Sequence, residues 1–379
     1  MTDQPTPPRR RRSRRRGRRI AAVAAAVVVV LLGLLLGGYA HRNVTGPRRE
    51  LDAVAEAGFR EQRAAVDGCV LTYAEGPDNG PPLVLIHGQG SRWQDHARVL
   101  PELAKDHHVF AVDVPGHGGS DRLPPDRYTN VAVGDLLAGF VRQVVGGPTI
   151  VAGHSSGGLL ALHIAAAHPD LVSGLFLEDP PLFSSEMPRL ITTYGGTMLL
   201  HADRFLAAGR PGDDFQLYML QHGNYFELFG PLAGPITDDA VDRARDRPGE
   251  PVRAWYLPSE VTVFFDGLVR YDPAFGAAWV RDGGRWYAGF DTEAALTAVR
   301  VPTTVLHTNY FEATEGTAYD GAGRLRAAMD SADVSRALDL LPSGTRLVQV
   351  ASGHLAHYER PQEYLDALRG LSGRITTTW

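Results

Sequence analysis

The chain has 379 residues, 44% of them apolar, which is enough for a buried core and excludes a disordered protein. Residues 1–19 hold nine arginines and one aspartate, so the net charge of −5 leaves −13 on the rest, and the body of the chain lacks the basic surface that nucleic-acid binding needs. The single cysteine, Cys69, excludes an internal disulfide and a cysteine-based metal cluster.

Residues 20–40 form an apolar stretch without a charged side chain, directly after the arginine-rich residues 1–19. As a helix this stretch spans about 30 Å, the hydrocarbon thickness of a bilayer. Because arginines stay on the cytoplasmic side, we expect a cytoplasmic tail over 1–19, a single-pass anchor in the cell membrane over 20–40, and an extracytoplasmic body. A secretory signal cleaved near Gly38 or Ala40 is the alternative, which would leave the body secreted.

Residues 41–60 are expected to form a short stalk that leads into a helix, and eight short apolar runs follow. The first two runs are joined across Asp67-Gly68 and predict a strand pair. The predicted strands are 64–66, 69–73, 83–86, 109–112, 149–152, 175–177, 303–306 and 346–350, and the predicted helices are 93–103, 128–145, 158–168 and 361–371. Their alternation predicts an α/β fold with a mainly parallel eight-stranded sheet and helices on both faces.

Residues 153–157, Gly-His-Ser-Ser-Gly, lie between a predicted strand and a predicted helix. Ligands of parallel sheets bind beyond the carboxyl ends of the strands, which is where this segment falls. The G-x-S-x-G spacing suits a nucleophile, because the central serine sits in a strained turn and the flanking glycines give the backbone room. Only Ser155 is centred between Gly153 and Gly157, so the spacing selects Ser155 over Ser156.

Two further glycine-containing segments follow predicted strands. His87-Gly88-Gln89-Gly90 is a turn whose backbone N–H can join that of Ser156 in stabilising an oxyanion. Residues 113–120, Asp-Val-Pro-Gly-His-Gly-Gly-Ser, follow the next strand. With these three motifs in this order, the chain resembles the α/β-hydrolase family over about 61–180 and 300–372. The resemblance implies an oxyanion hole made by the backbone N–H groups of Gln89 and Ser156, and a base that follows the last strand.

His354 follows the last predicted strand on a glycine-containing loop. A neutral imidazole there can take the proton of Ser155 and later protonate the leaving group. His357, three residues on, is the alternative base. His87, His117 and His154 are expected to have structural roles in their loops. None of the 14 histidines forms an H-x-x-x-H pattern paired with a carboxylate, so we predict no metal site.

The position of the acid that would orient the base departs from the pattern of the family. Many members of the family that the chain resembles place an aspartate after the penultimate strand, but here phenylalanine fills that position and Glu312 comes one residue later. Some members use the end of the preceding strand, where Asp179 stands. We expect Asp179 to orient His354, with Glu312 as the alternative and Glu178 or Asp320 as further candidates.

Residues 181–299 divide the predicted core into 61–180 and 300–379, and they are too long for a simple connection. Their helical character and large apolar side chains predict a lid over the strand ends. Most of these side chains are expected to pack the lid itself, and the others to line an acyl pocket. Asp291 or Thr292 is expected to start the helix that ends near Val299.

These features predict a membrane-anchored serine hydrolase that acts on a small-molecule or lipid-like acyl substrate, cleaving carboxylic esters or related compounds through an acyl-enzyme on Ser155 without a cofactor. Peptidase, carbon–carbon-bond hydrolase, cofactor-free haloperoxidase and acyltransferase activities use the same residues and stay open. A non-catalytic, membrane-anchored binding protein is the alternative of another class, motivated by the irregular acid position. The sequence contains no motif that binds the phosphates of a nucleotide. It also does not indicate an oligomeric state.

Overall fold

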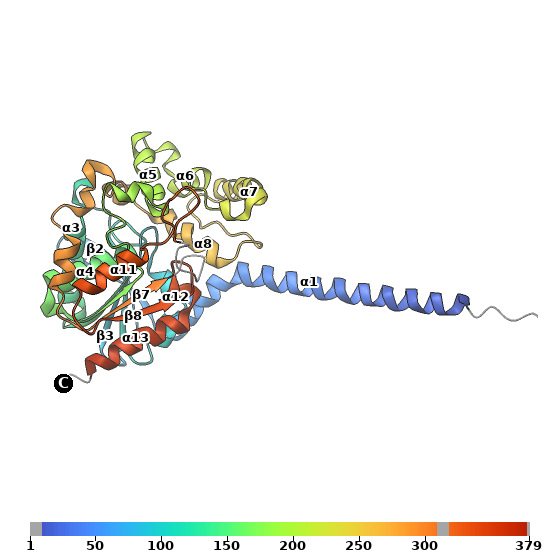
Figure 1. Ribbon diagram of the computed structural model, residues 1–379, viewed down its shortest axis with the longest axis horizontal. Coiled ribbons are helices and arrows are strands. Elements are labelled where there is room, and N and C mark those ends of the chain that lie inside the picture. Colours follow the sequence, from blue (N-terminus) through green and yellow to red (C-terminus); the bar gives the residue numbers. More distant parts are fainter. Residues whose placement is uncertain (1–9, 309–317, 377–379) are drawn as a thin grey trace, which may run out of the picture.

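The computed structural model describes residues 10–308 and 318–376. A central sheet carries helices on both sides, and one long helix projects from this body (Figure 1). The strands are β1 (Arg60–Val66), β2 (Cys69–Glu75), β3 (Pro82–Ile86), β4 (His108–Val112), β5 (Thr149–His154), β6 (Val172–Glu178), β7 (Thr303–Thr308) and β8 (Arg346–Val350). All eight predicted strands are therefore confirmed.

The strands lie in the order β1-β2-β4-β3-β5-β6-β7-β8. β1 pairs with β2 across the turn at Asp67 and Gly68, both of which have a positive φ, and this pair is antiparallel. β2 is also antiparallel to β4, whereas every later pairing is parallel. The mainly parallel eight-stranded sheet is confirmed, and the carboxyl ends of β3, β5, β6, β7 and β8 meet at one edge.

Both faces of the sheet are buried. Val84 and Ile86 of β3 belong to one apolar cluster, while Leu83 and Leu85 belong to another, because successive side chains of a strand point to opposite faces. The first face is covered by α3 (Asn130–Phe140), α4 (Ser156–Ala167), α10 (Thr292–Ala298) and α11 (Ser331–Leu340). The second is covered by α2 (Leu100–Leu103), α12 (Ala356–Glu359) and α13 (Pro361–Thr376).

All four predicted helices differ in extent from the observed ones: α4 begins at Ser156 and ends at Ala167 instead of covering 158–168, and α13 continues to Thr376 instead of ending at 371. The helix predicted over 93–103 is broken into a 3-10 turn (Trp93–His96) and the short α2, which starts one residue before Pro101. Proline has no N–H and disfavours a helical residue before it, so one continuous helix does not form. The helix predicted over 128–145 begins at Asn130, because the Thr129 side chain caps its first turn.

The lid predicted from the sequence consists of short helices placed between β6 and α10. They are α5 (Tyr194–Ala207), α6 (Phe215–His222), α7 (Ala233–Asp246), α8 (Ser259–Asp266) and α9 (Pro273–Ala278). In Figure 1, α5 to α8 lie together on one side of the sheet. Asp291, and not Thr292, caps α10 by accepting a hydrogen bond from the N–H of Ala294 (2.8 Å).

The first helix, α1 (Arg10–Glu56), continues through residues 41–56 of the segment 41–60 for which a stalk was predicted. Over its apolar part the side chains are exposed, and among the described residues it is the one helix long and apolar enough to cross a membrane. Its last turns pack on the body, where Val54 is 2% exposed. Asn43 Nδ2 also donates to the carbonyl of Trp255 (2.9 Å), and the Tyr39 hydroxyl donates to the carbonyl of Tyr256 (3.1 Å). The helix therefore contacts the lid at the end of its apolar stretch.

Candidate active site

Ser155 lies in the turn between β5 and α4, with φ 53° and ψ −123°. A non-glycine residue in this conformation is uncommon, and strain of this kind exposes the side chain at the top of a strand. The Ser155 N–H donates to the carbonyl of Glu178 on β6 (2.9 Å), and the Ser155 carbonyl accepts from Gly158 (2.8 Å). The turn is thus fixed from both sides, and Ser155 lines the cavity above the sheet.

The two glycines of the motif make room for backbone. A Cβ on Gly153 would lie 2.2 Å from the carbonyl oxygen of Gly157. A Cβ on Gly157 would lie 2.4 Å from the carbonyl oxygen of Ile86. Both distances are far below van der Waals contact, so only glycine fits at either position. Gly157 is therefore required by the close approach of the turn to β3, and Gly153 by the close approach of the end of β5 to the backbone of Gly157.

The turn after β3 lies directly against Ser155. A Cβ on Gly88 would be 3.0 Å from the Ser155 Cβ. The turn is held by His117, whose Nε2 accepts from the N–H of Gly90 (3.2 Å), and by Tyr271, whose hydroxyl accepts from the side-chain amide of Gln89 (2.9 Å). Gln89 and Ser156 both line the cavity that contains Ser155. Ser156 is the first residue of α4, where a helix leaves N–H groups without an intrahelical acceptor.

Asp179 stands at the end of β6 and is completely buried. Its Oδ2 accepts a hydrogen bond from His354 Nδ1 (2.7 Å) and another from the Thr308 hydroxyl (2.6 Å). Its Oδ1 accepts from His307 Nδ1 (3.1 Å) and from the Thr308 N–H (3.2 Å). Three donors from the end of β7 and one from the loop after β8 therefore hold this carboxylate in one orientation.

The other predicted acids lie elsewhere. Glu178 contacts His357, and Asp320 pairs with Arg324 (2.7 Å) on the surface. Glu312 falls outside the described residues. Among the carboxylates that the structure describes, Asp179 is the one hydrogen-bonded to His354.

The contact between His354 and Asp179 shifts both pKa values in the direction that favours the charged pair. Burial alone would raise the pKa of Asp179, but the hydrogen bonds from His307 and His354 outweigh it and hold this pKa below its usual range. Burial alone would lower the pKa of His354, but the hydrogen bond to Asp179 raises it above that of free imidazole. An imidazolium at His354 is thus stabilised, as a proton acceptor during acyl transfer requires.

His357, the alternative base, is 1% exposed and has a different environment. Its Nδ1–H donates to Glu178 (2.8 Å), and its ring stacks on that of His96 at 4.5 Å. Burial lowers the pKa of His357 to about 3 and raises that of Glu178 to about 7. His354 lines the cavity with Ser155, whereas His357 does not.

The remaining histidines near the site hold loops together. His87 donates from Nδ1 to the Gly88 carbonyl (2.7 Å) and accepts the N–H of Val114 at Nε2 (3.0 Å). Burial lowers the pKa of His87 to about 4, so it is neutral at pH 7. His154 donates from Nε2 to the His354 carbonyl (2.9 Å). These contacts agree with the structural roles expected for them.

A cavity of about 860 Å³ lies between the sheet edge and the lid. Apolar lid side chains line it: Leu190, Met198, Leu199, Met219, Val261, Val263, Phe264 and Trp279. Ser155, His354, Gln89 and Ser156 line the part next to the sheet. A cavity of this size, lined by apolar lid side chains and also by charged groups such as Glu227, Arg324 and Arg326, suits an organic ligand with an apolar part.

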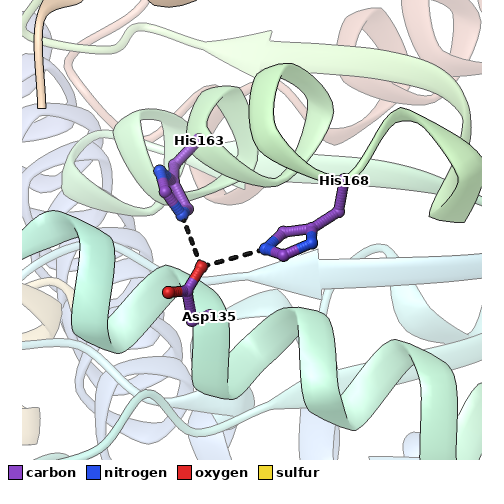
Figure 2. Close-up of side chains that lie close together, drawn as sticks. All are labelled: Asp135, His163 and His168. Atoms are coloured by element: carbon purple, nitrogen blue, oxygen red, sulfur yellow. Dashed lines mark hydrogen bonds and ion pairs between the residues drawn. The ribbon is translucent and has the colours of Figure 1, made fainter.

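Sequence reasoning missed two groups of residues. His307 and Thr308 support Asp179, and the one available signal was their position at the carboxyl end of the strand beside β6. The second group is Asp135, His163 and His168, which lie together away from the cavity (Figure 2). A search for H-x-x-x-H cannot detect them, because the two histidines are five positions apart and the aspartate comes from another helix.

Comparison with known proteins adds to this geometry. A family model described as alpha/beta hydrolase fold matches residues 81–361. The pimeloyl-[acyl-carrier protein] methyl ester esterase of Chromobacterium violaceum is 44% identical over 105 residues, and Lipase LipV of Mycobacterium tuberculosis is 39% identical over 108 residues. Each match covers 28% of this chain and 39% of the relative. A bacterial membrane phospholipase A superposes with a TM-score of 0.59 at 21% identity, covering 95% of this chain and 99% of that one, which shows a shared fold.

Proposed function

The chain belongs to the α/β-hydrolase fold family, and from this premise we propose that it is a serine hydrolase that cleaves carboxylic esters or related acyl compounds. Ser155 is the nucleophile, His354 the general base and Asp179 the acid that orients it. One observation carries the proposal: Ser155, in its strained turn, lines the same cavity as His354, whose Nδ1 lies 2.7 Å from Asp179.

The acylation step uses these groups in order. His354 Nε2 takes the hydroxyl proton of Ser155 as Oγ attacks the acyl carbonyl carbon. The resulting oxyanion accepts hydrogen bonds from the backbone N–H groups of Gln89 and Ser156. Collapse of the tetrahedral intermediate breaks the bond to the leaving alcohol, which receives the proton from His354. The acyl group stays on Ser155.

Deacylation repeats the sequence with water. His354 takes a proton from a water molecule, and the hydroxide formed attacks the acyl-enzyme carbonyl. The carboxylic acid leaves, and the proton returns to Ser155 Oγ. Asp179 stabilises the imidazolium form of His354 in both halves of the reaction. Four hydrogen bonds fix the Asp179 carboxylate in place, and this supports its assignment as the acid that orients His354.

We further propose an acyl substrate with an apolar chain. The apolar lid side chains along the cavity support this, because they offer a surface to hydrocarbon, although charged side chains such as Glu227, Arg324 and Arg326 also line the cavity. The esterase and the lipase among the relatives point to the same class of chemistry.

We propose that α1 anchors the enzyme in the cell membrane, with the arginine-rich end in the cytoplasm and the hydrolase body outside. The exposed apolar surface of α1 supports an anchor, and the nine arginines support the orientation. Fusion of alkaline phosphatase to the C-terminus gives active phosphatase under this proposal, and a fusion that is inactive in intact cells contradicts it. The mass of the native protein distinguishes an uncleaved anchor from a secreted product that has lost residues 1–40.

Labelling by a fluorophosphonate tests the nucleophile. The full-length chain in detergent should be labelled, and Ser155→Ala should abolish labelling and turnover. Ser156→Ala is the matched control: it removes a neighbouring hydroxyl but keeps the backbone N–H, so labelling should persist. Folded wild-type protein that takes no label would instead favour a non-catalytic binding protein.

A series of p-nitrophenyl esters of increasing chain length, assayed with the same preparation, tests the substrate class. The proposal expects kcat/KM to rise with chain length until the cavity is filled, since each buried methylene contributes about 0.8 kcal/mol. A maximum at acetate would contradict the apolar acyl pocket.

A further inference from the structure

Asp135, His163 and His168 form a cluster between α3 and α4 (Figure 2). Asp135 lies on α3, His163 on α4, and His168 is the residue that ends α4. One carboxylate oxygen, Asp135 Oδ1, lies 2.8 Å from His163 Nε2 and 2.9 Å from His168 Nε2. The two imidazoles therefore converge on one point, and all three donor atoms lie within 4.8 Å of one another.

Packing against α3 fixes the orientation of the His163 ring without any bound ion. The His163 side chain is 9% exposed, and its ring fits into a notch of α3 at Gly134, where a Cβ would lie 2.4 Å from its Cδ2. A glycine inside a helix lowers the stability of the helix by about 1 kcal/mol relative to alanine. The close approach of the His163 ring therefore requires a residue that destabilises α3. The centroid of the Phe290 ring lies 6.1 Å from that of His163. His163 thus presents its Nε2 in a defined direction.

The local charge favours a cation. α4 ends at this cluster, and the last carbonyl groups of a helix carry partial negative charge. Asp135 adds a full negative charge and is half exposed, yet among the described residues its ion-pair partners are His163 and His168 and not an arginine. The side chain of His168 is 25% exposed, so a solvated ion can reach the cluster.

Two imidazole nitrogens and one carboxylate oxygen are a ligand set suited to Zn²⁺ and poorly suited to Ca²⁺ or Mg²⁺, which take oxygen ligands. Tetrahedral zinc about 2.0–2.1 Å from each ligand needs donor atoms roughly 3.3 Å apart. The two distances from Asp135 Oδ1 must therefore lengthen by about half an ångström, and the two imidazole nitrogens, which lie within 4.8 Å of one another, must reach the same separation of roughly 3.3 Å. The exposed side of the cluster leaves a position for water.

We propose that Asp135, His163 and His168 form a binding site for Zn²⁺ that joins α3 to the C-terminal end of α4. Ser156 begins α4 and His168 ends it, so about 18 Å of helix separates the cluster from the nucleophile turn. The ion at this site therefore stabilises the layer of helices beneath the catalytic turn and takes no part in acyl transfer. The proposal does not depend on the hydrolase assignment.

The test uses the full-length, tag-free chain in detergent, freed of metal with EDTA and then dialysed against Zn²⁺. We expect one zinc per chain by elemental analysis and a rise in Tm of about 3–5 °C at saturation. Asp135→Asn keeps the shape of the side chain and loses the charge, and His168→Ala removes one exposed ligand. Each should weaken zinc binding more than tenfold and abolish the rise in Tm.

His108→Ala is the matched control. His108 is also a partly exposed histidine beside carboxylates, 3.2 Å from Glu75 and 3.6 Å from Asp78, but its two nitrogens face different partners and form no converging set. Zinc binding and Tm should match the wild type in this variant. The proposal is overturned if wild-type protein retains no stoichiometric zinc, or if Asp135→Asn and His168→Ala both bind zinc as the wild type does. Should His168→Ala fail to fold, Asp135→Asn alone decides the outcome.

Discussion

Asp179 Oδ2 lies 2.7 Å from His354 Nδ1, although 175 positions separate the two residues in the chain. The carboxyl ends of β6 and β8 lie on either side of β7, so the two loops that carry these residues meet above it. Asp179 is fully buried, and its remaining lone pairs are taken by His307 and Thr308. The carboxylate therefore has one orientation, and His354 keeps its second nitrogen for the cavity.

Replacing this acid should remove most of the activity. Asp179→Asn keeps the shape of the side chain but loses the charge that stabilises the imidazolium, and it can favour the wrong tautomer of His354. In a serine triad the equivalent change lowers kcat by about 10⁴-fold. Steady-state kinetics on a p-nitrophenyl ester measure the loss. Glu312→Gln is the matched control and should leave kcat within a factor of two or so of the wild type; the reverse ranking would assign the acid to Glu312.

The pH profile should report the state of His354. As a general base this residue must be neutral, so activity is lost as pH falls through its pKa. Asp179 raises that pKa, and the acid limb of kcat/KM should therefore have its midpoint above about 6.5, the value for free imidazole. In Asp179→Asn the residual activity should show a midpoint at lower pH. An unchanged midpoint in that variant would mean that a different group controls the acid limb.

His307 should act as a positioning residue for Asp179. His307→Phe fills the same buried space but donates nothing, leaving Asp179 without one of its four hydrogen bonds. A hydrogen bond to a charged group contributes about 1.5–3 kcal/mol, so we expect kcat to fall about ten- to hundredfold with little change in KM. His307→Gln restores an N–H donor and should recover part of the activity. If His307→Phe and His307→Gln behave alike, His307 contributes packing and not orientation.

The glycines of the nucleophile turn should be sensitive to a single methyl group. Gly157→Ala drives a Cβ to within 2.4 Å of the Ile86 carbonyl, so backbone must move. We expect a loss of about 1–3 kcal/mol in the free energy of unfolding, measured by denaturant titration, together with loss of activity. Gly195→Ala in α5 is the control, because nothing lies within 4 Å of its added Cβ. That variant should be neutral or more stable, and an equal loss in both would point to a general effect of the substitution.

Local sequence patterns were sufficient for the strands of the sheet and for the strained turn that carries Ser155. Short apolar runs bounded by turn residues found all eight strands, because a buried parallel strand needs continuous apolar side chains over a few residues. Gly153, Ser155 and Gly157 were found for a similar reason: the strained turn and the close approach of β3 impose their spacing within five consecutive residues. The long helix 93–103 was the local error, because the apolar pattern outweighed Pro101 in the prediction.

Contacts between distant residues needed the tertiary structure. The sequence offered several carboxylates as partners for His354, and nothing local distinguishes Asp179 from Glu178, its neighbour, whose side chain points instead to His357. Strand side chains alternate between faces, so adjacent residues at the end of β6 meet different residues of the segment that follows β8, and strand order brings that segment to β6.

The sequence by itself therefore determined the fold family, the serine in its turn and the apolar helix at the N-terminus, because each depends on residues close together in the chain. The tertiary structure decided the partner of His354, the support of Asp179 by His307 and the meeting of Asp135 with His163 and His168. These contacts depend on the order of the strands and on the packing of the helices. A hydrogen bond forms or is lost when two atoms move by a few tenths of an ångström, and the spacing of residues along the chain does not determine atomic positions to that precision.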